Sequence, residues 1–314
     1  MARRSTIELT FQEVQGTSPE RAVPGGTVVD WIDRTAYACA ASWARADCVT
    51  SYVGNMHFTT PVPKGRPVTV QARLVHTGTT SVHIQSRVLV RRGDGSWEVV
   101  TECMMIYVAV DSEGRPKAVD PFVPSTEREV QRDVDAVRRI ASRGRLEETI
   151  HSLPEGMGTS EALTLRFLAD SDERYPDGKI RGGEVMRWID QAAQICAERY
   201  CGYTAVAALT GGVRFYRPVR AGDLVEVDAR LVLTAHTAMH VLVSVRSGSR
   251  WETRPEQVAY GLPVMIAPEE DGSPRHITPW QPITDEDHAV AEKARRLREQ
   301  RNELMIMPNP VAMG

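Results

Sequence analysis

The chain of 314 residues is long for a single hydrophobic core and has the length expected of two domains of about 150 residues each. Its content of 42% hydrophobic and 25% charged residues is typical of a globular protein and excludes a disordered or fibrous chain. A formal net charge of -3, without any run of five like charges, argues against a nucleic-acid partner.

The N-terminal segment and the cysteines indicate the compartment and the kind of chemistry. "MARRSTIELTF" has two arginines but no apolar segment behind them, and no window holds 18 apolar residues, so we expect neither a signal peptide nor a membrane span. The expected location is therefore the cytoplasm. Because no cysteine pair has zinc spacing, we expect no metal site and a set of buried, reduced thiols at Cys39, Cys48, Cys103, Cys196 and Cys201.

The predicted elements follow the order strand, helix, several strands, helix. Residues 5–11 alternate as a strand does, and residues 25–44 have helical apolar spacing that begins at a glycine pair. Segments rich in β-branched residues and separated by Pro or Gly predict antiparallel strands over 49–58, 66–78, 81–92 and 97–111. Residues 138–158 predict the end of a surface helix and a linker. One long helix beside a meandering sheet indicates an α+β fold.

The second half of the chain repeats the first. "GGTVVDWID" at 25–33 returns as "GGEVMRWID" at 182–190, an offset of 157 residues. The same offset joins further identical residues, among them Cys39 and Cys196, Phe58 and Phe215, Gly65 and Gly222, and His83 and His240. We therefore predict two fused copies, with domain 1 over 1–146, a linker over 147–158 and domain 2 over 159–314.

The repeated helix carries an acid inside an apolar row. Val29, Asp33, Ala36 and Ala40 lie at i, i+4, i+7 and i+11, and Asp190 takes the place of Asp33 in the second copy. Because the desolvation of a carboxylate is costly, an acid in such a row needs a hydrogen-bonding or charged partner, or has a functional role. The alternative is that the row lies at the border of the helix and the acid is solvated.

Several motifs carry a resemblance to a known family. They are the glycine pair followed after six residues by Asp, "VTSYVGNMHFTTPVPKG" at 49–65, and "YVAVDSEGRPK" with "PFVPST" after it. With these motifs the chain resembles tandem hotdog-fold acyl-CoA thioesterases of the cytosolic acyl-CoA hydrolase and YciA-like family. The resemblance implies two hotdog domains paired as a pseudo-dimer, each with an antiparallel sheet wrapped around a long central helix. It also implies hydrolysis of fatty acyl-CoA to free fatty acid and CoA without metal or cofactor, and a homo-oligomer of three chains.

The two helix features suggest how a site is built. Backbone amides at a helix start can polarise a thioester carbonyl, which makes Gly25, Gly26, Gly182 and Gly183 candidates, although glycines there also suit a permissive entry turn. Asp33 lies about 10 Å beyond Gly26 along the axis, too far to serve a carbonyl at its own helix start. Two antiparallel helices would bring each acid beside the other copy's glycines. Asp33 and Asp190 are thus candidate general bases or nucleophiles, and the sequence leaves both roles open.

Other site residues come from the resemblance. The family has an Asn in an N-G-x-x-x-G-G loop that orients water or substrate; the matching residues are Asp177 in "DGKIRGG" and Glu20 in "ERAVPGG". Thr79, Thr80 and Ser81 align with a family turn that contacts pantetheine and phosphate, and Arg66 is a candidate for the CoA phosphates; a plain turn and a solvated arginine are the alternatives.

The two sites should be unequal, and two other functions compete. "DGKIRGG" keeps the family's glycine, whereas "ERAVPGG" has Arg21 there and Pro24 beside the pair, so we expect Asp33 to be the more important acid. Hydration or dehydration of acyl thioesters would need Asp and His together on a loop, and no such pair is found. A non-catalytic acyl-CoA binder or sensor would keep the cleft without needing the carboxylate.

Overall fold

The computed structural model describes residues 4–12, 22–58, 60, 62–151, 158–170, 174–175, 178–251 and 254–306. Both halves have the predicted order of elements. The first half contains β1 (Thr6–Phe11), α1 (Gly25–Ala44), β2 (Asp47–Val53), β3 (Met56–His57), β4 (Val68–Thr77), β5 (Ser81–Arg91), β6 (Trp97–Val110) and α2 (Glu127–His151). The second contains β7 (Ala162–Leu168), α3 (Gly182–Cys201), β8 (Val206–Thr210), β9 (Val213–Phe215), β10 (Leu224–Thr234), β11 (Met239–Gly248), β12 (Glu256–Gly261), β13 (Val264–Ile266) and α4 (Asp285–Ile306).

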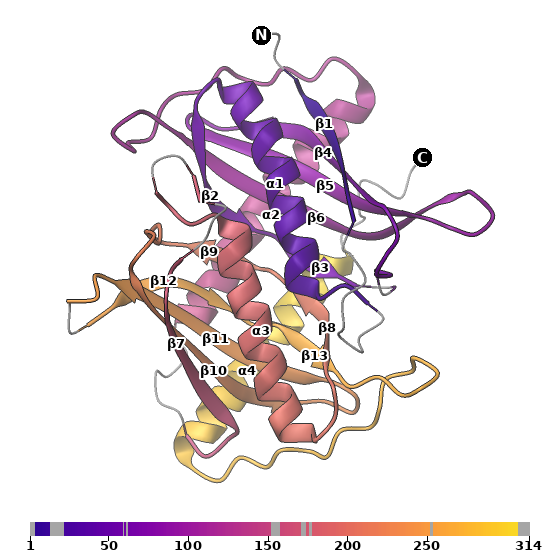
Figure 1. The fold of residues 1–314 in the computed structure, drawn as a ribbon, viewed down its shortest axis with the longest axis vertical. Helices are drawn as coiled ribbons and strands as arrows, with labels where there is room; N and C mark the ends of the chain where they lie inside the picture. The colour runs from indigo at the N-terminus through magenta and orange to yellow at the C-terminus, as the bar shows by residue number, and fades with distance from the viewer. Residues whose placement is uncertain are drawn as a thin grey trace.

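All the described strands join one antiparallel sheet that runs through both halves (Figure 1). Two pairings cross from one half to the other: β2 pairs with β9, and β3 pairs with β8. The crossing needs a glycine, because Gly211 has a φ of 94° and a Cβ there would lie 2.0 Å from the carbonyl oxygen of Gly54. The halves therefore share a continuous sheet, and each covers an edge that the other would leave open.

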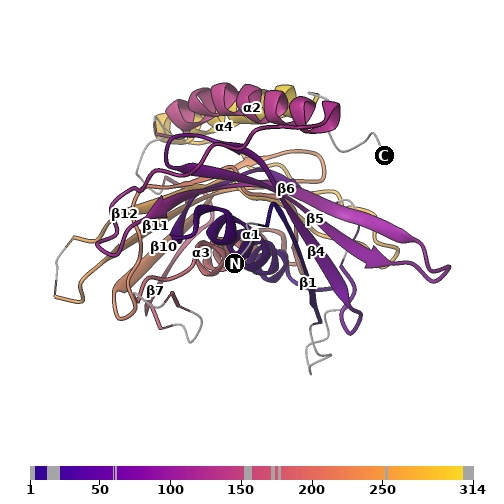
Figure 2. The same cartoon turned by 90° about the horizontal axis from the view of Figure 1, so that it is seen from above.

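The helices form two layers on opposite faces of the sheet (Figure 2). α1 and α3 pack side by side on the concave face, and α2 and α4 lie together on the other face. Each central helix buries an apolar stripe, which includes Val29, Ile32 and Ala36 in α1 and Met186, Ile189 and Ala193 in α3. The predicted α+β fold is confirmed, and the two central helices lie on the same side of one sheet.

One large apolar core extends through both halves, and a smaller one lies under α4. Cys39, Cys48, Cys103 and Cys196 are buried as predicted, but Cys201 is partly exposed because it is the last residue of α3. Helix α2 continues to His151 and so enters the segment 147–158 expected as a linker, of which 152–157 lie outside the described residues. None of the described helices has the length and hydropathy to cross a bilayer.

Candidate active site

Each acid of the central helices meets the first turn of the other central helix. Asp33 accepts a hydrogen bond from the Gly183 amide, with 3.0 Å between Oδ2 and N, and Asp190 accepts one from the Gly26 amide at 2.8 Å. The helices must therefore run antiparallel, as the reciprocal arrangement requires. Neither helix has a side-chain cap of its own, since Pro24 and Arg181 precede them. The acid from the other helix therefore accepts from an amide that no side-chain cap satisfies, and at α1 it also supplies the acid that the first turn lacks.

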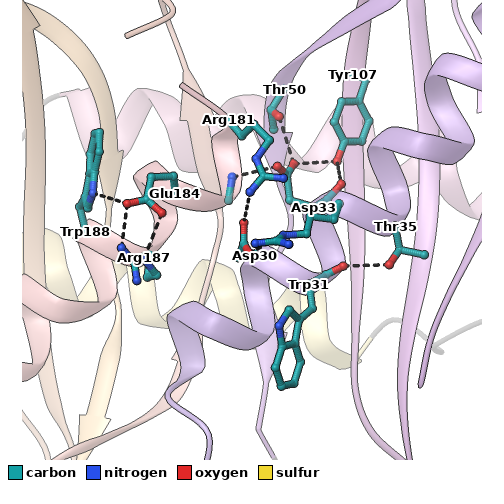
Figure 3. Close-up of polar contacts among 12 residues, drawn as sticks. Asp30, Trp31, Asp33, Thr35, Thr50, Tyr107, Arg181, Glu184, Arg187 and Trp188 are labelled. Carbon is teal, nitrogen blue, oxygen red and sulfur yellow. Dashed lines mark hydrogen bonds and ion pairs between the residues drawn. The ribbon is translucent and has the colours of Figure 1, made fainter. Parts of the chain in front are cut away.

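Asp33 lies in a dense set of hydrogen-bond donors (Figure 3). Its side chain is fully buried, and its Oδ1 accepts from the hydroxyls of Tyr107 at 2.8 Å and Thr50 at 3.2 Å. Burial raises the pKa of Asp33, and the Tyr107 bond, the Gly183 bond, the Arg181 charge and the Thr50 bond partly offset the rise. The carboxyl is thus held in one orientation and is more basic than an ordinary aspartate.

Asp190 has a much poorer environment. It is also buried, but its Oδ1 has no hydrogen-bond partner among the described residues. Ala207 stands at the repeat position of Thr50, and Met265, which pairs with Met239 as Tyr107 pairs with Val82, stands at that of Tyr107, so neither position supplies a hydroxyl. Burial raises the pKa of Asp190 to about 6, and the Gly26 amide lowers it only in part. The two acids share a position in the repeat but differ in chemistry.

A cavity of about 250 Å³ lies on the Asp33 side of the junction between the halves. Thr50, the hydroxyl partner of Asp33, and Gly182, the first residue of α3, both line it. Most of the wall is apolar, with Val49, Val108, Ile180, Val185, Phe215 and Val258, and the polar part includes Tyr175, Lys179 and Arg217. The cavity can therefore take an apolar chain whose polar end faces the start of α3.

The glycines predicted to polarise a carbonyl divide into two kinds. The amides of Gly26 and Gly183 hold the carboxylates and are not open to a ligand in this structure. The amide of Gly182 donates to no acceptor within the part of the chain that the structure describes, and Gly182 lines the cavity. Gly25 packs instead against Ala207 and Asp190, so a Cβ there would lie 3.3 Å from the Ala207 Cβ. Gly182 is the glycine best placed for a substrate.

The remaining predicted site residues are not gathered at the cavity. Asp177 lies outside the described residues, although Gly178 after it has the positive φ of 80° that suits a glycine. Thr79 and Thr80 lie in the turn between β4 and β5, Ser81 begins β5, and Arg66 is exposed before β4; none of the four lines the cavity. Among the described residues no cluster of three or more His, Cys, Asp or Glu side chains suits a metal ion.

Sequence reasoning missed Thr50, Tyr107 and Tyr175. A signal existed for the first two, because the copies differ there at inward-facing strand positions: Thr50 stands against Ala207 and Tyr107 against Met265. A buried hydroxyl in one copy and an apolar side chain in the other indicate that only one copy needs the polar group. Tyr175 lies in a turn before α3, where the pattern gives no comparable signal.

Comparison with known proteins agrees with this architecture. The sequence model of the thioesterase superfamily matches residues 22–95 and 178–252. Protein VdlD of Helicobacter pylori is 30% identical over 156 residues, which cover 48% of this chain and 88% of that protein. The human cytosolic acyl coenzyme A thioester hydrolase is 21% identical over 241 residues, 71% of this chain; the chain spans 63% of the length of that relative.

A solved structure has the same fold over most of the chain. It is the putative oleoyl thioesterase from Lactobacillus plantarum, with a TM-score of 0.57 and 11% identity, covering 85% of this chain and 99% of that one. Both matched segments of the superfamily contain a glycine pair and a helix acid, 25–33 in one and 182–190 in the other. The chain therefore belongs to the thioesterase superfamily, with two hotdog domains in tandem.

Proposed function

We propose that the protein hydrolyses fatty acyl-CoA thioesters to a free fatty acid and CoA, at a site built around Asp33. The observation that carries the proposal is the fully buried Asp33 carboxylate, whose partner Thr50 lines a cavity together with Gly182, the first residue of α3. The apolar cavity wall suits the acyl or pantetheine chain, and the names of the human and other relatives support acyl-CoA as substrate.

In the proposed reaction Asp33 acts as a general base. Water adds to the thioester carbon while its proton passes to Asp33, and the Gly182 amide stabilises the oxyanion. The carbon–sulfur bond then breaks, and the CoA thiolate takes the proton from Asp33. Two donors engage Oδ1 and one engages Oδ2, so a lone pair of Oδ2 is left to accept the proton of water, and isotope labelling distinguishes this base from a nucleophile. The step needs only water and residues of this chain, so we propose no metal or cofactor.

The role of Asp33 can be tested by isotope labelling. In a single turnover in ¹⁸O-labelled water, a general base gives a fatty acid that carries the label. A nucleophile forms an acyl-enzyme anhydride first, and water attack on the aspartyl carbon would send unlabelled enzyme oxygen into the product. Unlabelled fatty acid in the first turnover would exclude the general-base step.

We propose one working site per chain. Asp190 lacks the hydroxyl partners of Asp33, and Gly25 packs directly against it, so its part is that of a cap for α1. The test measures thioester hydrolysis with a panel of acyl-CoAs and a thiol reagent. Asp33→Asn should lose about 100-fold or more in kcat, a loss typical for a missing general base, while Asp190→Asn keeps most of the activity. Equal losses mean two working sites, and no hydrolysis by the native protein means an acyl-CoA binder.

Assembly and location belong to the same proposal. We propose a homo-oligomer of three chains, supported by an exposed apolar row on α2, where Val130, Val134 and Val137 keep 49%, 39% and 46% of their surface. Light scattering that shows a 34.9 kDa monomer at micromolar concentration would contradict it. The word cytosolic in the name of the human relative supports a cytoplasmic location.

A further inference from the structure

Tyr175, which lines the cavity, has a buried hydroxyl that makes no hydrogen bond of standard geometry with the described residues. The residue is 8% exposed, and the neighbouring hydroxyl of Thr50 already donates to Asp33. A hydroxyl buried in this way costs free energy, and native proteins keep such groups rarely. The cavity that Tyr175 lines is the one bounded by Thr50 and Gly182. A polar ligand group in this cavity is therefore a candidate for the missing partner.

Both halves of the chain hold Tyr175 in place. Its amide donates to the carbonyl of Lys179 at 2.9 Å, and its carbonyl accepts from the Gly178 amide at 2.9 Å, which closes a turn before α3. Its ring packs against the ring of Tyr37 from α1, with 4.8 Å between the centroids. The hydroxyl position is thus fixed by the backbone on one side and by the first half on the other.

The Tyr175 hydroxyl keeps its proton more strongly than an ordinary tyrosine. Burial raises the pKa of Tyr175 well above its ordinary value, the nearby Asp33 carboxylate and Tyr37 add to the rise, and the Thr50 hydroxyl and the Arg181 charge offset it only in part. The hydroxyl of Thr50 already donates to Asp33 at 3.2 Å. Tyr175 therefore adds a proton donor that Asp33 does not engage, close to the carboxylate.

We propose that the Tyr175 hydroxyl is a catalytic hydrogen-bond donor that binds the thioester oxygen together with the Gly182 amide. The inference rests on the proposed hydrolysis at Asp33. When water adds to the thioester carbon and its proton passes to Asp33, the oxygen becomes negative and the two donors stabilise it. Its charge returns as the carbon–sulfur bond breaks and the thiolate leaves with the proton from Asp33.

The other copy has no tyrosine in this place. Seven residues before the glycine pair the second copy has Tyr175, whereas the first copy has Ser18. The polar groups around Asp33, namely Thr50, Tyr107 and Tyr175, thus lack tyrosine or threonine counterparts around Asp190. The copies keep the acid and the glycine pair but differ at the three positions that carry hydroxyls around Asp33.

The experiment replaces one hydroxyl and keeps the ring. Tyr175→Phe should lower kcat for an acyl-CoA about 100-fold, as the loss of one oxyanion donor does, while KM changes less than about threefold. The melting temperature should stay the same or rise, because an unpaired buried hydroxyl has been removed. Tyr200→Phe is the matched control: its hydroxyl donates to the carbonyl of Thr278 at 2.8 Å at the exposed end of α3, and Tyr200 does not line the cavity, so kcat should stay within about twofold.

The outcomes separate this inference from the proposed function. If Tyr175→Phe keeps full kcat while Asp33→Asn loses it, hydrolysis at Asp33 stands and the role of Tyr175 is overturned. A rise in KM alone, a kcat loss accompanied by a fall in melting temperature, or a kcat loss reproduced in Tyr200→Phe also overturns it. If Asp33→Asn retains activity, the proposed site itself is wrong. A kcat loss confined to Tyr175→Phe, in a protein of unchanged stability, supports the inference.

Discussion

The carboxylate of Asp33 in α1 accepts a hydrogen bond from the amide of Gly183 in α3, 150 residues further along the chain. The hydrogen bond requires α1 and α3 to pack closely at Gly183, where α3 has no side chain. A Cβ on Gly183 would lie 2.9 Å from the Asp30 Cα and 2.9 Å from the Asp33 Cβ. Gly183 therefore holds the acid and also permits the close approach that the bond needs.

The first prediction concerns this close approach. Gly183→Ala should push α1 and α3 apart, because the new methyl group meets the backbone of Asp30, which cannot rotate away. We expect a loss of about 1–3 kcal/mol in the free energy of unfolding, as for overpacked cores, and a lower kcat. Denaturant unfolding and thioester hydrolysis measure the two effects.

Gly93→Ala is the control for that measurement. A Cβ at Gly93 meets no atom within 4 Å, so stability should stay within about 0.5 kcal/mol of the native protein. If Gly183→Ala has the stability and the kcat of the native protein, α1 and α3 are not as close at Gly183 as the structure has them.

The second prediction is a shift in the pH dependence of hydrolysis. A general base must be ionised, so activity falls as the pH drops through the pKa of Asp33. Burial raises that pKa, and the Tyr107 hydrogen bond is the largest contribution that lowers it again. In Tyr107→Phe the pKa should rise further, and the acid limb of kcat against pH should move to higher pH.

The control for Tyr107 is another tyrosine hydroxyl with a hydrogen bond. Tyr200 donates to the carbonyl of Thr278 at 2.8 Å, at the exposed end of α3, and its hydroxyl does not contact Asp33. Tyr200→Phe should leave the acid limb where it is. An acid limb that stays in place or moves to lower pH in Tyr107→Phe would mean that Asp33 is not the group that titrates.

The reciprocal helix arrangement could be predicted from the sequence because it depends on local geometry. The spacing from the glycine pair to Asp33 fixes a distance along the helix axis, and the repeat at Asp190 gives the symmetry. The strand segments and the shared edge also followed from patterns of period two and from the duplication. The resemblance then indicated the hotdog arrangement, which the superfamily match and the fold bear out.

The surroundings of the acid could not be predicted in the same way. Thr50 comes from β2 and Tyr107 from β6, and only the curvature of the sheet brings both hydroxyls to one carboxylate. Alternation along a strand indicates which side chains face inward but not which of them meet. The sequence also gave no means to see that the Gly183 amide binds Asp33 rather than a substrate.

The third prediction concerns the dependence of each half on the other. Residues 1–151 alone would expose the open edge of β2 and the apolar face of α1, and residues 152–314 would expose β9 and α3. We expect each piece to be inactive and to aggregate, and co-expression of both to restore hydrolysis. Size-exclusion chromatography and activity measure this. A soluble, monomeric and fully active single half would contradict it.

The fourth prediction is a cost in stability from Asp190 that depends on pH. Burial raises the pKa of Asp190 from 3.8 to about 6 in the folded protein, whereas the unfolded chain keeps an ordinary value. Between these two values the folded state holds the proton and the unfolded state does not. The native protein should therefore lose stability as the pH rises from about 4 to 6, by roughly 3 kcal/mol in total.

Asp190→Asn cannot ionise at this position and should not show this loss. Any other effect of the substitution on the free energy of unfolding should be independent of pH. The difference in free energy of unfolding between variant and native protein should grow in favour of the variant from pH 4 to 6 and stay constant above that.

Asp271→Asn is the opposite control, because hydrogen bonds from Ser273 lower the pKa of exposed Asp271. The Asp271 charge therefore stabilises the fold, and that contribution fades as the pH falls. Denaturant unfolding at several pH values measures both differences. If the difference in free energy of unfolding between Asp190→Asn and the native protein does not change with pH, the Asp190 carboxyl has an ordinary pKa and is not buried against Gly26.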